Sequence, residues 1–239
     1  MARSRISLHT LHPSQNSLLA SLPGNLVDQL APGLTTLGLK QGDVLCEAGE
    51  DVDDVYFPHD GMLSLLSVMK DGNAVEVAMV GREGVFGAMT GFGLAKSQVR
   101  AVVQLPMTAS KIPVARFRSL VKASDDLQAM SIRYNEILIG QARITAACNA
   151  YHPVRARLCR WLLQAADRAA SDTIALTQQS LAEMLGVRRT SVTEVAQAIQ
   201  ETGAISYSRG VIMILDRHRL LQSSCECHQT LVDQSAELS

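Results

Sequence analysis

Apolar and polar residues follow three different patterns along the chain, and each pattern predicts a different kind of structure. Between about residues 34 and 111, short apolar runs are separated by turns rich in glycine and acidic residues, which is typical of strands. After Pro113, apolar residues recur at steps of three and four for more than thirty residues, which predicts a long helix. Shorter helical segments and two further apolar runs follow from residue 152. The chain is therefore expected to have an α+β fold, in which a strand-rich part is followed by a long helix and then by shorter helices and strands.

The strand-like part predicts a small jelly-roll-like β-barrel domain over residues 16–112, preceded by a flexible N-terminal arm at residues 1–15. Runs at residues 62–69 and 74–80 flank Lys70-Asp71-Gly72-Asn73, which predicts a hairpin. The glycine-rich segment 81–91 follows. It could present backbone N–H groups to an anion, but a lone glycine cluster is a weak signal, and we favour a purely structural turn.

The helical pattern over residues 113–151 predicts a long dimerisation helix with a hinge at its end. A seam at heptad-like spacing is long enough to pair with the same seam of a second copy. The alternative is a helix that lies on its own barrel. His152-Pro153 interrupts the pattern, because proline disfavours helical geometry before it and lacks an N–H donor. The predicted dimer interface consists of Leu127, Met130, Tyr134, Ile137, Gln141 and Ile144, and the seam ends at Cys148.

Residues 152–228 predict a winged helix-turn-helix domain, followed by a C-terminal tail at residues 229–239. Its first helix carries an apolar stripe, with Arg155, Arg157 and Arg160 expected on the outer side. In residues 176–200, Thr177 can cap one helix and Gly186 can end it, before a second helix begins near Arg189. A strand, a Ser-Arg-Gly turn and a second strand then complete the wing.

Polar residues on the second helix of this pair are expected to meet base edges and phosphates. A helical hairpin with a merely wet polar face is the alternative, but the wing behind it favours DNA binding. The predicted DNA-binding residues are Thr177, Gln178, Arg188, Arg189, Thr190, Ser191, Thr193, Glu194, Gln197 and Arg209.

Composition and charge agree with this interpretation. The 239 residues are 47% apolar and 19% charged, as in soluble globular proteins. The net charge is −1, but residues 151–221 hold nine Arg, no Lys and six acidic residues, which gives +3. No apolar run has the length of a membrane span and the start lacks a secretory signal, so we expect a cytoplasmic protein without membrane contacts. Five scattered cysteines make a disulfide framework improbable.

The order of barrel, long helix, hinge and winged helix resembles the Crp/Fnr family of transcription regulators over nearly the whole chain. Gln41-Gly42-Asp43, Glu47-Ala48-Gly49-Glu50 and Val55-Tyr56-Phe57 are similar to the family's barrel opening. Residues 176–195, with Ile205-Ser206 and Arg209-Gly210, are similar to its DNA-reading end. The resemblance implies a homodimer on an inverted-repeat site, with one recognition helix in each of two major grooves about 34 Å apart. It also makes RNA polymerase a candidate partner.

The resemblance also argues against the effectors best known for the family. Where members that bind cyclic AMP carry a glutamate and an Arg-Ser pair, this chain has Ala88 and Ser97-Gln98, so cyclic AMP is not expected. No cysteine precedes Cys46, which argues against the family's N-terminal iron–sulfur cluster, and no histidine motif indicates haem. The barrel either senses an unknown effector or is a ligand-free scaffold. The candidate pocket residues are Gly84, Val85, Phe86, Gly87, Ala88, Ser97, Gln98 and Arg100.

Cys225-Glu226-Cys227-His228 is a compact group of soft ligands that could form part of a zinc site or a redox switch. The usual two-residue spacer and a nearby fourth ligand are both missing. We therefore expect a tail that packs against the winged helix, with no metal and no cofactor.

The predicted function is a sequence-specific DNA-binding transcription regulator. The family's central recognition positions fall on Arg189, Thr190 and Glu194, and the last two differ from the family's usual residues, which predicts a different preferred DNA sequence. The alternative is a ligand-, metal- or redox-responsive sensor whose winged helix docks a protein partner. We find no nucleophile elbow, Walker loop, metalloprotease pair or dinucleotide fingerprint, so an enzyme is not expected.

Overall fold

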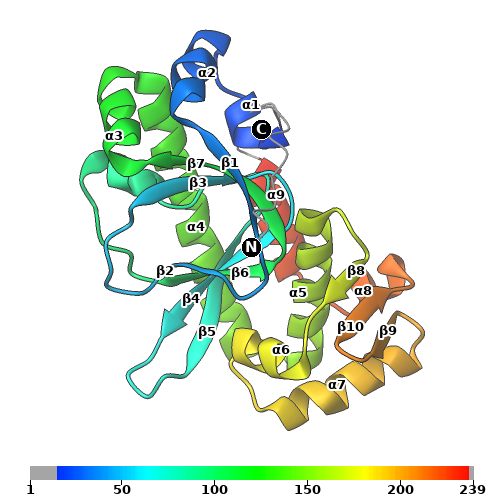
Figure 1. Cartoon of the computed structure of the whole chain (residues 1–239). Coiled ribbons are helices and arrows are strands. Elements are labelled where there is room, and N and C mark those ends of the chain that lie inside the picture. The colour runs from blue at the N-terminus through cyan, green and yellow to red at the C-terminus, as the bar shows by residue number, and fades with distance from the viewer. Residues whose placement is uncertain (1–14, 237–239) are drawn as a thin grey trace, which may run out of the picture.

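A computed structural model describes residues 15–236 of the protein (Figure 1). Two antiparallel sheets form its N-terminal half. The strands are β1 (Thr35–Leu39), β2 (Val44–Cys46), β3 (Asp54–Pro58), β4 (Met62–Val68), β5 (Ala74–Val80), β6 (Arg100–Leu105) and β7 (Met107–Pro113). One sheet has the order β1-β7-β3 and the other the order β2-β6-β4-β5. One apolar core includes Phe57, Leu63 and Val103 from both sheets, which confirms the predicted barrel.

The predicted hairpin and the glycine-rich turn are both present. β4 and β5 pair with Ser67 opposite Val75, and the chain turns at residues 69–73 between them. After β5, Gly87 has a φ of 88°, which disfavours residues with a Cβ, and a Cβ at Gly84 would overlap the hydroxyl of Tyr134. Backbone geometry and close packing therefore account for these glycines, in agreement with the structural role. The 3₁₀ helix η3 (Ala88–Phe92) follows.

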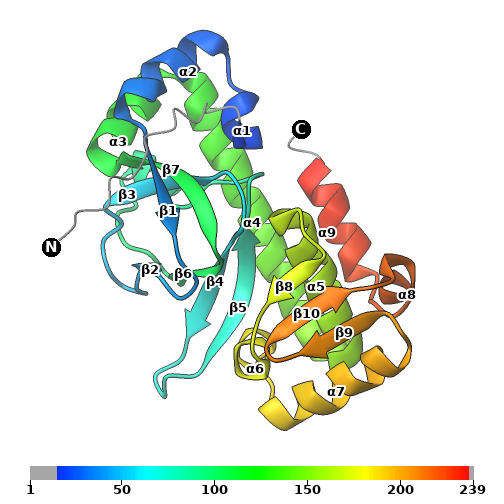
Figure 2. The same cartoon turned by 45° about the vertical axis from the view of Figure 1, so that its right-hand side comes forward.

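Short helices cover one end of the barrel in both views (Figures 1 and 2). They are α1 (Ser17–Ala20), α2 (Gly24–Leu30), the 3₁₀ helix η2 (Ala31–Gly33) and α3 (Val114–Ala123). The expectation of one continuous helix after Pro113 is wrong, because Ser124 is extended and its hydroxyl accepts from the N–H of Leu127 at 3.3 Å. This cap starts a new helix. Of the predicted arm at residues 1–15, all but residue 15 lies outside the described residues.

The long helix α4 (Asp125–Tyr151) lies on its own barrel through most of the residues predicted to form a dimer seam. Leu127, Met130 and Tyr134 are at most 8% exposed and belong to the barrel core. Gln141 is 5% exposed and accepts a hydrogen bond from the N–H of Met79. These four assignments to a dimer interface are corrected, because heptad spacing marks a buried stripe without identifying what buries it.

The C-terminal half is a helical domain with a small sheet. Its elements are α5 (Val154–Ala169), β8 (Thr173–Ala175), α6 (Gln178–Leu185), α7 (Arg189–Glu201), β9 (Ile205–Ser208), β10 (Val211–Ile214), α8 (Arg217–Gln222) and α9 (Cys227–Ala236). The sheet order is β8-β10-β9. Extended His152 and Pro153 separate α4 from α5, which confirms the predicted interruption. Of the predicted tail at residues 229–239, the described part, residues 229–236, belongs to α9, which packs on α4 and α5.

The barrel and the C-terminal domain share a second apolar core. Met62 and Met79 on β4 and β5, with Leu105 at the end of β6, pack into one cluster with Trp161 and Leu162 of α5. α6 also contacts β5. The two halves therefore meet through buried surface in addition to the covalent link between α4 and α5. Within the described residues, we find no helix that combines the length and apolar character of a bilayer span.

Candidate DNA-binding surface, effector pocket and metal cluster

Local capping forms the helix pair α6 and α7 as the sequence predicts. The hydroxyl of Thr177 accepts from the N–H of Ser180 at 3.1 Å, which satisfies an otherwise unpaired donor in the first turn of α6. Gly186 ends α6 with a φ of 61°, and α7 begins at Arg189. Leu181 and Val192 are fully buried and hold the two helices together. The tight turn thus fixes how α7 is presented.

The outer face of α7 is open to solvent, whereas its inner face is closed. Val192, Ala196 and Ile199 are at most 3% exposed. A 13-residue helix is about 20 Å long, and such a helix fits the major groove of B-DNA. The predicted readers Arg188, Arg189, Thr190, Thr193, Glu194 and Gln197 are all exposed, and Ser191 is half-buried.

One predicted base-reading residue, Thr193, makes hydrogen bonds within the protein. The hydroxyl of Thr193 donates to Oε1 of Gln178 at 2.7 Å and lies 3.1 Å from the carbonyl oxygen of Arg189. The first bond joins α7 to the start of α6. Thr193 and Gln178 therefore position the two helices relative to each other, which leaves Thr190 and Glu194 as the central free side chains on this face.

A polar hollow of about 390 Å³ lies between the start of α6, α7 and the wing. Arg189 and Arg209 line it, together with the N-terminus of α6, and cations beside free backbone N–H groups suit a phosphate. The hydroxyl of Tyr207 donates to the carbonyl oxygen of Leu176 at 2.9 Å and ties the wing to α6. The complete lining is Thr177, Gln178, Gln179, Arg189, Tyr207, Arg209 and Gly210.

Of these lining residues, Gln179, Tyr207 and Gly210 were not among the predicted DNA contacts. Two of them have a position in the sequence that indicates where they lie. Gln179 is next to two predicted contacts, and Tyr207 lies on a strand that leads to the wing turn. Strand alternation alone could not show that Tyr207 reaches back to α6.

The expectation that Arg157 and Arg160 lie on the outer side of α5 is wrong, because both are buried. They are 6% and 4% exposed, and Arg168 on the same helix is 9% exposed. Arg157 donates to the carbonyl oxygen of Leu185 at the end of α6. Long arginine stems pack along apolar surface while their guanidinium groups find acceptors, so burial of these residues does not require a polar core.

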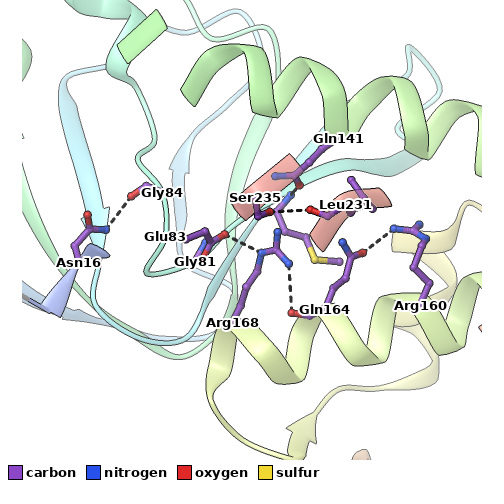
Figure 3. A network of polar contacts seen from close by, with 11 residues as sticks. Asn16, Gly81, Glu83, Gly84, Gln141, Arg160, Gln164, Arg168, Leu231 and Ser235 are labelled. Atoms are coloured by element: carbon purple, nitrogen blue, oxygen red, sulfur yellow. Dashed lines mark hydrogen bonds and ion pairs between the residues drawn. The ribbon is translucent and has the colours of Figure 1, made fainter. Parts of the chain in front are cut away.

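Arg160 and Arg168 take part in a polar network between the domains (Figure 3). Nη1 of Arg160 donates to Oε1 of Gln164 at 2.7 Å, and Nε of Arg168 lies 3.0 Å from Oε1 of Glu83 in the barrel. Glu83 also accepts from the N–H of Gly81. Arg168 thus links the C-terminal domain to the barrel, and both buried arginines are unavailable to DNA.

The remaining positive charge of the domain lies near the helix pair and the wing. Arg217 is ion-paired with Asp167 and Asp172, and Arg219 with Asp216. Among the described residues of α5 to α8, the exposed arginines outside these ion pairs are Arg155, Arg188, Arg189 and Arg209. Three of the four belong to the predicted DNA-binding set. The excess of arginine in this part of the sequence therefore places exposed positive charge at the start of α7 and on the wing.

Glu76 of β5 is buried where the barrel meets α5. It is 5% exposed, and it accepts hydrogen bonds from Nε1 of Trp161 at 2.7 Å and from the hydroxyl of Ser64. Burial raises the pKa of Glu76 to about 7, although both hydrogen bonds and the charges of Arg160 and Arg168 favour the ionised form. The interface therefore contains a carboxyl that changes its charge near neutral pH.

A barrel pocket of about 230 Å³ matches most of the predicted effector residues. Its walls include Val85, Phe86, Gly87, Ala88, Ser97 and Gln98, and α4 closes it with Tyr134 and Leu138. Ser97 donates to the carbonyl oxygen of Val99 at 2.7 Å, so its hydroxyl is engaged locally. Lys96 is the only charged lining residue among those described, and it pairs with Asp51 near the surface.

Two predicted pocket residues do not line this cavity. Gly84 is buried against Tyr134, as described above. Nε of Arg100 lies 2.7 Å from Oε2 of Glu47, and the residue lines a different cleft between the barrel and the wing. These two assignments are corrected, because strand register places Arg100 on the opposite side of the sheet from the pocket.

Four potential metal ligands converge where α4 meets the C-terminal segment. The ligand atoms of Cys148, His152, Cys225 and Cys227 all lie within 4.8 Å of one another. The argument that Cys225 and Cys227 lack further ligands is therefore wrong. Cys148 and His152 complete the set, whereas His228, the nearest histidine in sequence, does not belong to it.

The contacts within the cluster also shift the pKa values of Cys148 and His152. Burial raises the pKa of Cys148, but Arg160, His152 and the neighbouring thiols lower it by more, so its pKa lies below the usual thiol value. The pKa of His152 is raised, chiefly by its interaction with Cys148 and then by Glu226.

Comparison with known proteins yields two matching family models. The model of the cyclic nucleotide-binding domain matches residues 37–124, and the model of the Crp-like helix-turn-helix domain matches residues 156–223. Among curated proteins, the global nitrogen regulator of Nostoc sp. strain PCC 7120 is 25% identical over 176 residues. That alignment covers 70% of this chain and 78% of the regulator.

Solved structures show the same fold. A putative transcriptional regulator of the crp/fnr family from Eubacterium rectale has a TM-score of 0.67 and 17% identity, over 91% of this chain and 98% of that chain. FixK2 from Bradyrhizobium japonicum has a TM-score of 0.68 and 15% identity, over 80% of this chain and 98% of that chain. Barrel, long helix and helix-turn-helix therefore occur together in these proteins.

Proposed function

Because this chain is a DNA-binding transcription regulator of the Crp/Fnr family, we propose that it acts as a homodimer on an inverted-repeat DNA site. Each protomer places one α7 helix in a major groove, and half-sites one helical turn apart match the two-fold symmetry. The family is not one of enzymes. The regulator works in the cytoplasm, where its DNA is found, and the DNA-bound dimer is a candidate partner of RNA polymerase.

The observation that carries this proposal is the contrast between the two faces of α7. Its apolar side is buried, and its polar side is exposed beside a wing that carries Arg209. Arg188 and Arg189 lie where α7 begins, so a guanidinium can reach guanine or a phosphate with two parallel hydrogen bonds. Thr190 and Glu194 extend the same face by one turn and set the preference among bases.

The outer side of α4 provides a surface for the second protomer. Six residues spaced alternately four and three apart lie along this side of the helix, and most of them are exposed. Ile132 is 50% exposed, and residues at steps of three and four on one side of a helix can pack against the same side of a second copy. The proposed seam is Ile132, Glu136, Ile139, Arg143, Ala146 and Ala150, with the half-buried Ile137 and Ile144 at its border.

The barrel pocket does not suit a cyclic nucleotide. A buried phosphate needs a cation or a dense set of donors. The positions expected to supply them carry Ala88, with no polar group, and Ser97, whose hydroxyl is already bonded. With about 230 Å³, the pocket is also smaller than the roughly 300–1,000 Å³ of typical ligand sites. We therefore propose that cyclic AMP does not stabilise this barrel, which a thermal shift measurement with millimolar nucleotide would test.

Salt titration of duplex binding tests the proposed DNA binding. Fluorescence anisotropy with random duplex DNA should show binding that weakens steeply as salt rises, because each neutralised phosphate releases counterions. Selection of bound genomic fragments should then return an inverted repeat with half-sites about ten base pairs apart. If the winged helix instead docks a protein partner, the chain should bind random duplex DNA at low salt no better than an acidic control protein does.

A further inference from the structure

The cluster at the junction of α4 and α5 joins residues that are far apart in the chain. Cys148 and His152 lie at the end of α4, whereas Cys227 begins α9 and Cys225 lies two residues before it. Three thiols and one imidazole are a ligand set typical of structural zinc sites. We propose that these four side chains bind one zinc ion in a tetrahedral site.

The distances between ligand atoms fit a single ion. Sγ of Cys148 lies 3.5 Å from Sγ of Cys225, and Sγ of Cys227 lies 3.6 Å from Nδ1 of His152. A tetrahedral zinc ion with Zn–S bonds of about 2.3 Å holds its thiolates roughly 3.8 Å apart. A disulfide would need sulfur atoms about 2.05 Å apart, and the thiolates of an iron–sulfur cluster must reach around several metal ions. The spacing thus favours one tetrahedral ion.

Local structure explains why the ligands point to one place. Cys148 and His152 are four residues apart, which places them on one face of the last turn of α4. Cys225 and Cys227 flank one residue at a turn in which the N–H of His228 donates to the carbonyl oxygen of Cys225. All three cysteines are at most 8% exposed, and Ile144 and Ala156 pack against them. The site is therefore closed, as structural zinc sites are.

Glu226 supplies the outer contact that a histidine ligand normally has. Nε2 of His152 lies 3.1 Å from Oε1 of Glu226, while its Nδ1 faces Cys227. Ligating histidines usually donate their second N–H to a carboxylate, which fixes the ring and strengthens the donor atom. The observed arrangement orients Nδ1 toward the ion.

Two buried arginines balance the charge of the occupied site. Three thiolates, a neutral imidazole and Zn²⁺ carry a net charge of −1. Arg157 and Arg160 are close enough to interact favourably with the thiolate of Cys148, and Nε of each is buried without a hydrogen-bond partner among the described residues. These cations offset the charge that a zinc–thiolate site would otherwise leave buried.

Zinc at this position would link α9 to the end of α4, next to the hinge at Pro153. α9 packs against both α4 and α5, and the four ligands lie on either side of Pro153. A bound ion therefore fixes the angle at which α5, and with it the helix pair, leaves α4. This inference does not rest on DNA binding, because the ligands lie away from the exposed face of α7.

Metal analysis of the full-length protein tests the site. Protein purified under reducing conditions without chelator should contain about one zinc per chain, and Cys225→Ser should lower the content at least tenfold. Cys46→Ser, which changes a buried barrel cysteine outside the cluster, is the matched control and should keep the metal. Wild-type protein without zinc after chelator-free purification and incubation with zinc, or equal loss in both variants, would overturn the proposal.

Two further measurements guard against variants that fail to fold. Chelator-stripped wild-type protein should rebind Co²⁺ with the visible absorption of a tetrahedral thiolate complex, and zinc should displace it. Glu226→Gln should weaken zinc about tenfold through loss of the bond to His152, whereas Asp233→Ala on the exposed side of α9 should not. Freshly reduced and metal-free wild-type protein that shows no cobalt spectrum would contradict a metal site.

Discussion

Two faces of the C-terminal domain use similar residues in opposite ways. On the outer face of α7, arginine, threonine and glutamate side chains are exposed, and most are not bonded within the described chain. Where α5 meets the barrel, charged and polar side chains are buried and bonded to specific partners. The buried set is Glu76, Arg160, Trp161, Gln164 and Arg168. One face is open to a partner, whereas the other is already occupied by the same chain.

This difference indicates how the barrel can influence DNA binding. The helix pair contacts β5 and shares an apolar core with the barrel, so α7 cannot be reoriented without a change at this interface. A proton on Glu76, which is bonded to Trp161 of this core, would act on the interface directly. The two faces can therefore be separated by mutation, with stability as the readout for one and DNA affinity for the other.

The largest expected effect is at Trp161. Trp161→Ala should lower the free energy of unfolding by about 3–5 kcal/mol, because it removes a 1% exposed aromatic side chain from the shared core and leaves Glu76 without its indole donor. Urea denaturation measures the loss. Trp161→Phe keeps much of the packing and should cost about 1–3 kcal/mol. A cost below 1 kcal/mol for the alanine variant would show that the interface is not a shared core.

The next effect concerns the ionisation of Glu76. Its pKa is raised from 4.5 to about 7 in the folded protein, so the folded state binds the proton more tightly than the unfolded chain does. The stabilisation is complete below about pH 4.5 and is lost as pH rises through 7, which amounts to roughly 3 kcal/mol. The stability of wild-type protein relative to Glu76→Gln, measured from pH 5 to 8, should therefore fall with rising pH. A constant difference would refute this assignment.

The sequence predicted well those features that depend on neighbouring residues. The cap at Thr177 and the left-handed turn at Gly186 are local, so the helix pair and its exposed face followed from spacing. The faces of α4 and α5 did not. Periodicity located the stripe that contains Leu127 and Tyr134, but it could not tell a second copy from the chain's own barrel. Arginines on α5 were placed outside because their charge, taken alone, favours water.

The metal cluster shows a different limit of sequence analysis. Cys148 and Cys225 are 77 residues apart, and only the packing of α9 on α4 brings them together. A search for ligands with short spacers therefore found half of the set. The pairing of an i, i+4 Cys-His pair with the Cys-x-Cys segment is the signal that could have suggested the complete site.

A smaller effect should separate the two arginine environments. Arg189→Ala should weaken binding to the selected DNA site by about 1–3 kcal/mol through loss of a bidentate base contact, and change unfolding by less than about 0.5 kcal/mol. Arg155→Ala, which removes an exposed arginine outside α7, is the matched control. Anisotropy with specific and random duplexes distinguishes the roles, since an equal loss on both would make Arg189 a phosphate contact only.

The smallest effect tests the boundary between the two faces, at two threonines one turn apart on α7. Thr193→Val removes the donor to Gln178 without changing the side-chain shape, so it should cost about 0.5–1 kcal/mol of unfolding free energy. Thr190 is exposed and has no hydrogen bond from its side chain among the described residues, so Thr190→Val should leave stability within about 0.5 kcal/mol and instead alter the preferred DNA sequence. Urea denaturation and binding-site selection on both variants make the comparison. Equal effects of the two substitutions on stability would mean that Thr193 does not link α7 to α6, and the outer face would then extend over both residues.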